Sequence, residues 1–185
     1  SNIDGDHDLF FLLAREPDFN WRAYANGLLD VMGKLNIQRF YTIGGVQDTI
    51  SHSGPVLITV VGSTPTAVAG TIELEQGIRA AEYQGPVSIH SYLIRACSEA
   101  AVEAVSLWGH VPAYLQKSPR VVAKLVSILN KAVGMHCSVK PLNQKSIELD
   151  RKINEALARD PDLKHLVETI EGKENPKTPL PGDDK

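Results

Sequence analysis

The chain has 185 residues, of which 43% are hydrophobic and 22% are charged, and its net charge is -3. This composition is that of an ordinary folded domain and excludes a largely disordered chain. The slight acidic excess argues against a nucleic-acid partner, because neutralising phosphates needs clustered Lys and Arg. No apolar run reaches the roughly 20 residues that span a bilayer, and the N-terminus lacks a signal-peptide pattern. We therefore expect a cytoplasmic protein with no membrane partner.

The first elements along the chain are a strand and a helix. Residues Leu9–Leu13 form a short apolar run, which predicts a strand buried on both faces at the centre of a sheet. Asp18 or Asn20 can cap a following helix, whose apolar residues recur at steps of three and four from Trp21 to Leu35. That apolar face is expected to cover the sheet.

The same alternation continues in the middle of the chain. Phe40–Ile43 and Val56–Val61 are rich in β-branched and aromatic residues and are bounded by glycines, which predicts two more strands. Ser88 can cap a helix with one apolar stripe, and this helix leads into a strand at Val102–Leu107.

The last part of the chain is predicted to be helical. A helix capped by Ser118 ends at Gly134, which suits a C-terminal stop. Two further helices, Leu142–Ala158 and Pro161–Glu171, carry apolar stripes, and no strand follows them. From Gly172 onward the chain is charged and Pro-rich, which predicts a disordered tail.

Together these elements predict an α/β fold with a mostly parallel sheet and helices on both of its faces. Residues 3–141 are expected to form this core, residues 142–171 the added C-terminal helices, and residues 172–185 the tail. Because the added helices exceed what one sheet needs for cover, their apolar stripes predict a homo-oligomer. The candidate contact residues are Tyr114, Leu115, Leu163, Leu166, Val167 and Ile170. Alternatively, both helices pack on their own domain.

The sequence shows no pattern of a dedicated metal or phosphate site. It contains no HExxH, no CxxC, no P-loop and no GxGxxG, so we expect neither a metal nor a cofactor. The two cysteines, Cys97 and Cys137, are far apart in sequence and are expected to be buried free thiols.

Candidate binding residues lie where the predicted strands end. In open parallel sheets, ligands bind beyond the carboxyl ends of the strands. The residues at such positions are Gly44, Gly45, Asp48, His52 and His110. A cleft lined by them would take a polar small molecule or the end of a peptide. The alternative is that the two glycines form a tight turn and that each histidine is hydrogen-bonded in a surface loop.

Five short motifs occur in a fixed order: Arg15–Trp21, Gly44-Gly45, Ser51–Pro55, Tyr83–Pro86 and Ser106–Tyr114. In this order they resemble the prokaryotic branch of the proteasome assembly chaperone 2 family, over the chain from Asp8 to about Ile170. The resemblance implies a three-layer αβα fold similar to nucleoside phosphorylases, and self-association. The family's usual Pro-His-Thr-Arg-Pro motif has Gly54 in place of its arginine here. Family members also begin with a strand and a glycine-rich turn that this chain lacks, so we expect a truncated N-terminus.

Two functions from different classes follow. The resemblance implies a protein-binding, assembly-chaperone-like module that associates with itself or with partner subunits. The rival is a small-molecule enzyme of phosphorylase or hydrolase type that uses His52 and His110, or an ATP-dependent carboxylate-amine ligase, since family proteins often carry an ATP-grasp label. The last residues, Pro181–Lys185, lack the hydrophobic-Tyr-X tail through which the eukaryotic chaperones engage the proteasome, which weakens the case for direct engagement of that kind. Assembly of another partner, or only of itself, is the alternative.

Overall fold

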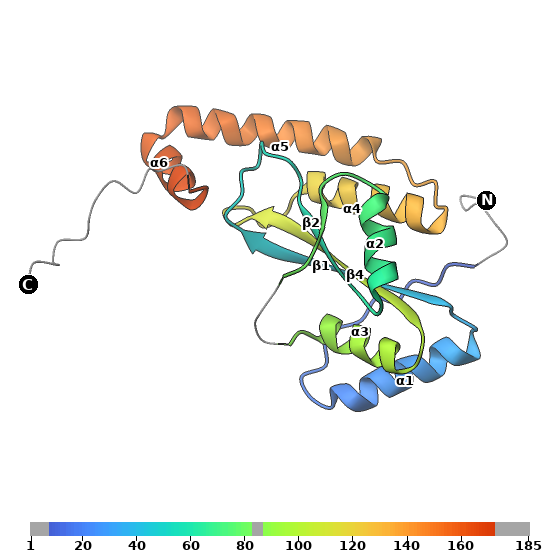
Figure 1. Cartoon of the computed structure of the whole chain (residues 1–185). Coiled ribbons are helices and arrows are strands. Elements are labelled where there is room, and N and C mark those ends of the chain that lie inside the picture. Colours follow the sequence, from blue (N-terminus) through green and yellow to red (C-terminus); the bar gives the residue numbers. More distant parts are fainter. Residues whose placement is uncertain (1–7, 83–86, 173–185) are drawn as a thin grey trace, which may run out of the picture.

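The computed structural model describes residues 8–82 and 87–172, and it confirms the predicted α/β fold (Figure 1). Its elements are, in chain order, α1 (Trp21–Lys34), β1 (Arg39–Asp48), β2 (Ile58–Gly62), α2 (Pro65–Glu73), β3 (Ile78–Ala80), α3 (Ile89–Glu99), β4 (Glu103–Pro112), α4 (Pro119–Val133), α5 (Lys140–Arg159) and α6 (Pro161–Ile170). In the part of the chain so described, no helix is both long enough and apolar enough to cross a membrane.

The four strands form one sheet in the order β1-β4-β2-β3. Strand β4 runs parallel to β1 and antiparallel to β2, and β2 runs parallel to β3. Two of the three pairings are therefore parallel, as the alternation of strands and helices predicted. Because β4 lies between two neighbours, most of its side chains are buried, whereas β1 forms an edge of the sheet.

Helices cover both faces of this sheet (Figure 1). On one face, α2 and α4 pack against a core that contains Ile58, Leu107 and Ile128, all fully buried. On the other face, α3 and α1 meet Ala104 of β4 through Cys97 and neighbouring side chains. Helix α5 then packs on α4, and α6 packs on α5, so the C-terminal helices lie against their own chain.

Polar side chains begin the helices where the sequence predicted it. Asn20, Ser88 and Ser118 each accept a hydrogen bond from a backbone N–H in the first turn of α1, α3 and α4. Asp160 does the same for α6. Gly134 ends α4 with a φ of 62°, a conformation that glycine adopts without the steric cost of a side chain.

The prediction for Leu9–Leu13 was wrong. This segment forms no strand, and Phe10, Phe11, Leu12 and Leu13 are 58% to 100% exposed. An apolar run shows only that burying the segment would lower the free energy of the chain. It does not show which other element would cover the segment. None of the four described strands pairs with it.

Three further predictions need correction. Strand β1 does not end at Ile43 but continues through Gly44 and Gly45, so the two glycines form no turn. Sequence reasoning also missed α2 and β3, although Thr64 caps α2 and is followed by a proline in its first turn. Of the two cysteines only Cys97 is buried, because Cys137 is exposed beyond the end of α4. The predicted tail from residue 173 onward and the Tyr83–Pro86 motif lie outside the described residues.

We expect Gly109→Ala to lower the free energy of unfolding by about 1–3 kcal/mol, because a packed core must shift to take an extra methyl group. A Cβ atom at Gly109 would overlap Cγ1 of Val121 and lie 3.2 Å from Cδ1 of Leu125, both on α4. Gly45→Ala is the matched control, since Gly45 is the register partner of Gly109 and its Cβ would meet only a carbonyl oxygen at 3.9 Å. Urea unfolding measures both variants, and equal midpoints would contradict this packing.

Candidate functional site

The parallel pairing of β1 and β4 brings two of the candidate residues together at their carboxyl ends. Oδ2 of Asp48 lies 2.7 Å from Nδ1 of His110. The other ring nitrogen of His110, Nε2, lies 3.1 Å from the hydroxyl oxygen of Thr59 on β2. We call these three residues the His110 cluster. The hydrogen bond from His110 lowers the pKa of the Asp48 carboxyl below its ordinary value of 3.8.

The order of groups in the His110 cluster is that of an acid-base relay. A carboxylate that accepts the Nδ1–H of a histidine leaves Nε2 as the acceptor for a hydroxyl proton. Thr59, however, lies inside a paired strand, where it is the register partner of Trp108. The hollow that His110 lines next to the cluster has a volume of only about 10 Å³, close to the space of one water molecule. The cluster therefore has the groups of a relay, with Nε2 of His110 already bonded to Thr59.

His52 belongs to a second group of bonded side chains, which we call the His52 cluster. Its backbone N–H donates to the hydroxyl oxygen of Tyr114 at 2.9 Å, and its Nδ1 lies 2.8 Å from the same oxygen. The Tyr114 hydroxyl donates to Oε1 of Glu171 at 2.5 Å. Arg120 donates to the carbonyl oxygen of His52 at 2.7 Å, and Asn154 lies 3.4 Å from Nε2.

The hydrogen-bond geometry assigns the proton on the His52 ring. The single hydroxyl proton of Tyr114 goes to Glu171, so the hydroxyl oxygen can only accept from Nδ1 of His52, which must carry a proton. Burial, followed by the bond to Glu171, raises the pKa of Tyr114 and keeps this hydroxyl a donor. The side chains of His52 and Glu171 are only 6% and 2% exposed, and their closest nitrogen and oxygen atoms are 3.7 Å apart.

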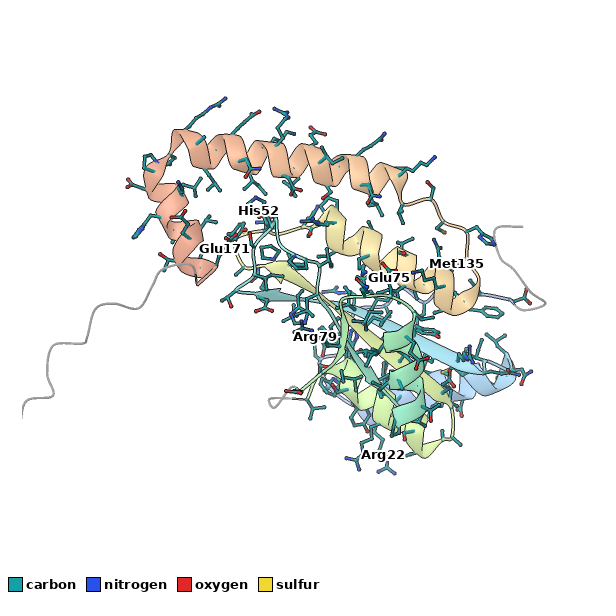
Figure 2. The ribbon with its side chains drawn as sticks, turned by 45° about the horizontal axis from the view of Figure 1, so that its top comes forward. Arg22, His52, Glu75, Arg79, Met135 and Glu171 are labelled. Carbon is teal, nitrogen blue, oxygen red and sulfur yellow. The ribbon has the colours of Figure 1, made fainter. Side chains whose placement is uncertain are left out.

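The His52 cluster connects segments that are far apart in sequence. His52 lies in the loop before β2, Tyr114 and Arg120 flank the start of α4, Asn154 is on α5, and Glu171 follows α6. Figure 2 shows His52 and Glu171 next to each other where α6 returns to the ends of the strands. Its hydrogen bonds to Asn154 and Glu171 hold the two C-terminal helices against this end of the sheet.

The five candidate cleft residues lie in three places: the His110 cluster, the His52 cluster and the interior of strand β1. Asp48 and His110 are in direct contact, and His52 lies in its own cluster beside the same small hollow. Gly44 lies under the indole of Trp108, whose ring atoms would be 2.8 Å from a Cβ at that position. Gly45 is paired with Gly109 inside the sheet.

Sequence reasoning did not connect four of the bonded residues with this site: Thr59, Arg120, Asn154 and Glu171. No spacing in the sequence relates them, because they meet only after the helices fold back. Tyr114 was named as a contact residue, and its neighbour Leu115 is half-buried. On α6, Val167 is buried in its own chain and Ile170 is half-buried, whereas Leu163 and Leu166 are exposed. Contact with another subunit at these positions stays a prediction.

We expect Tyr114→Phe to lower the free energy of unfolding by about 1.5–3 kcal/mol, since it removes the hydroxyl bonded to the buried Glu171 carboxylate. Hydrogen exchange should speed up selectively in residues 161–171, because α6 loses its bond to the loop at His52. Tyr24→Phe is the control, as the Tyr24 hydroxyl forms no side-chain hydrogen bond among the residues in the described ranges. Unchanged exchange in α6 would contradict the role given to the cluster.

The Asp48–His110 contact predicts a pH dependence of stability. Because folding lowers the pKa of Asp48, its stabilising effect is complete above the unfolded-state value and is lost as the pH falls through the folded-state value. Asp48→Asn should make the free energy of unfolding depend less on pH in the acid range. At neutral pH it should lower that free energy by less than about 1 kcal/mol, because the pair is partly exposed. Urea unfolding as a function of pH measures this. Asp30→Asn, at an exposed position of α1, should keep the wild-type profile.

Comparisons with solved structures show the same fold. A PAC2 family protein from Streptomyces avermitilis is 28% identical with a TM-score of 0.66, and the match covers 76% of this chain and 58% of that chain. A Mycobacterium tuberculosis proteasome-assembly chaperone homologue is 25% identical with a TM-score of 0.70, covering 82% and 63%. Pyrococcus furiosus PbaA, an archaeal homologue of proteasome-assembly chaperone, is 17% identical with a TM-score of 0.61, covering 83% and 63%, and shows the fold alone.

The chain spans 53% to 63% of the length of the first solved structures that it matches. None of the curated proteins compared with the chain matches it. The names of the matching structures give no support to the ATP-grasp label. The family model of the PAC2 family matches residues 1–157, which is most of the chain. On this match, and in agreement with the order of its sequence motifs, the protein belongs to the PAC2 family.

Proposed function

We propose that this chain is a protein-binding module of the assembly-chaperone type and that its partners are proteasome subunits. The observation that carries the proposal is the match to the PAC2 family over residues 1–157. Two structures of the same fold are named as homologues of proteasome-assembly chaperones, one of them at 25% identity. The cytoplasmic location expected from the sequence is part of this proposal.

The geometry of the strand-end site supports binding of a protein rather than turnover of a small molecule. Asp48, Thr59 and His110 are bonded to one another, and His52 is bonded to Tyr114. A substrate would have to displace Thr59 to reach Nε2 of His110, and the adjoining hollow has a volume of only about 10 Å³. The His52 cluster instead fixes the position of α6, which is what a rigid binding surface needs.

The surface that we assign to the partner is the outer side of α6. Leu163 and Leu166 are three residues apart, so they lie next to each other on one side of the helix. They are 37% and 55% exposed, although Val167 on the same helix is buried. Exposed apolar side chains that adjoin each other on a fixed helix are typical of protein contacts.

We expect Leu166→Glu to weaken binding of purified proteasome subunits at least tenfold, because an unpaired carboxylate would be buried in an apolar contact. The fold should persist, as Leu166 is 55% exposed in the chain itself. Val31→Glu is the matched control, since Val31 is 49% exposed on α1, against the opposite face of the sheet. Native mass spectrometry of the mixed proteins measures complex formation. Equal binding by the two variants would remove α6 from the contact, and no binding by the wild type would refute the proposed partner.

A further inference from the structure

One nitrogen of the His52 ring is hydrogen-bonded, and the other faces an acceptor. Nδ1 carries a proton, because the Tyr114 hydroxyl donates its own proton to Glu171 and accepts from the ring. Nε2 lies 3.4 Å from Oδ1 of Asn154. If the ring held only the Nδ1 proton, Nε2 would be one acceptor opposite another. A second proton, on Nε2, turns the same contact into a hydrogen bond from the ring to Asn154.

The second proton also makes the His52 ring a cation next to a buried carboxylate. The side chains of His52 and Glu171 are 6% and 2% exposed, and Nδ1 lies 3.7 Å from Oε1. Keeping a carboxylate away from water costs free energy unless an opposite charge and hydrogen bonds compensate for the lost hydration. An imidazolium supplies that charge, and Tyr114 supplies a hydrogen bond. Figure 2 shows the side chains of His52 and Glu171 next to each other.

Other ionisable groups approach His52 from β4, α4 and α5. Arg120 of α4 has a charge of the same sign as an imidazolium, but it donates to the backbone carbonyl oxygen of His52 and not to the ring. Asp150 is half-buried on α5, one helical turn before Asn154, and its negative charge favours a cation. His110 of β4 lines the same small hollow and is bonded within its own cluster. The charged group that lies against the ring itself is Glu171, which favours the cation.

We propose that His52 is a pH-sensitive switch that holds α6: its ring takes up a second proton at Nε2, binds Glu171 as a cation and donates to Asn154. In the unfolded chain neither partner faces the ring, so the folded state binds this proton more tightly. The stabilising effect is therefore complete in acid and is lost as the pH rises and the ring becomes neutral. An imidazole ordinarily loses its second proton between roughly pH 5 and 8. Above that range α6 is held less firmly, whatever protein it binds.

The switch is tested by amide hydrogen exchange of the whole chain as a function of pH. After correction for the intrinsic exchange rate, protection of residues 161–171 should fall at least tenfold between about pH 5 and pH 9, because a neutral ring leaves the Glu171 carboxylate uncompensated. Chemical shifts of the His52 ring nitrogens should show a charged ring at the acidic end of this range and a neutral ring at the alkaline end. Amides of α1, against the opposite face of the sheet, are the internal reference.

Two substitutions on α5 distinguish the His52 ring from other titrating groups. Asn154→Asp places a negative charge beside Nε2, so the midpoint of the loss should rise by about one pH unit. Asn143→Asp is the matched control, because it adds the same charge at an exposed position of the same helix, about 16 Å earlier along its axis. Its midpoint should equal that of the wild type.

Two further variants test which charges the switch uses. Glu171→Gln keeps an oxygen that accepts from Tyr114 but removes the negative charge, so protection of α6 should no longer fall as the pH rises. His165→Gln removes the exposed histidine of α6 itself and should keep the wild-type response. Urea unfolding at neutral pH checks that each variant is folded.

The proposal would be overturned by constant protection of α6 over this range, by equal midpoints in the two asparagine variants, by a response that Glu171→Gln keeps, or by one that His165→Gln removes. A ring that stays neutral at every pH would also overturn it, and would show that the Asn154 amide nitrogen donates to Nε2. Binding of proteasome subunits is no part of this test, so failure of the proposed function leaves its result unaffected.

Discussion

The register between β1 and β4 determines where the other parts of the molecule lie. Ten consecutive residue pairs join the two strands in parallel, so their carboxyl ends finish at the same end of the sheet. There Asp48 meets His110, and on the same strands Gly44 passes under Trp108. Among the described residues, β1 is bonded to a strand on one side, where β4 lies. A shift by one residue would turn every side chain of β1 to the opposite face and separate Asp48 from His110.

The polar groups at this end of the sheet hold elements together rather than create an open site. Burying a carboxylate or an imidazole costs free energy unless its hydrogen bonds are replaced inside the protein. In the His52 cluster the Tyr114 hydroxyl supplies these hydrogen bonds. Its oxygen accepts from His52, and its proton is donated to Glu171. The position of α6, and with it the orientation of Leu163 and Leu166, follows from these bonds.

Local signals in the sequence were sufficient to predict the helices whose ends are determined by neighbouring residues. Ser118 as a cap and Gly134 as a stop define α4 within a few residues, since both act on neighbouring backbone groups. Sequence reasoning failed where the deciding partner is remote. Gly44 looks like a turn residue until Trp108 is known to lie over it, and Leu9–Leu13 looks like a central strand although none of the described strands pairs with it. In the candidate site, the contact of Asp48 with His110 could be expected from parallel strands, but Glu171 could not.

The wide sequence separation within the His52 cluster has a consequence for the order of folding. The bond from Tyr114 to Glu171 spans 57 residues, and the contact of His52 with Asn154 spans 102. Such contacts cannot form before the later of the two residues has been synthesised, and Glu171 lies at the C-terminal end of the described chain. During synthesis the sheet and α4 can therefore fold while α6 is still missing, with His52 and Tyr114 exposed to water. The cluster closes only after residue 171 has left the ribosome, so the α6 surface is the last part of the described fold to reach its final position.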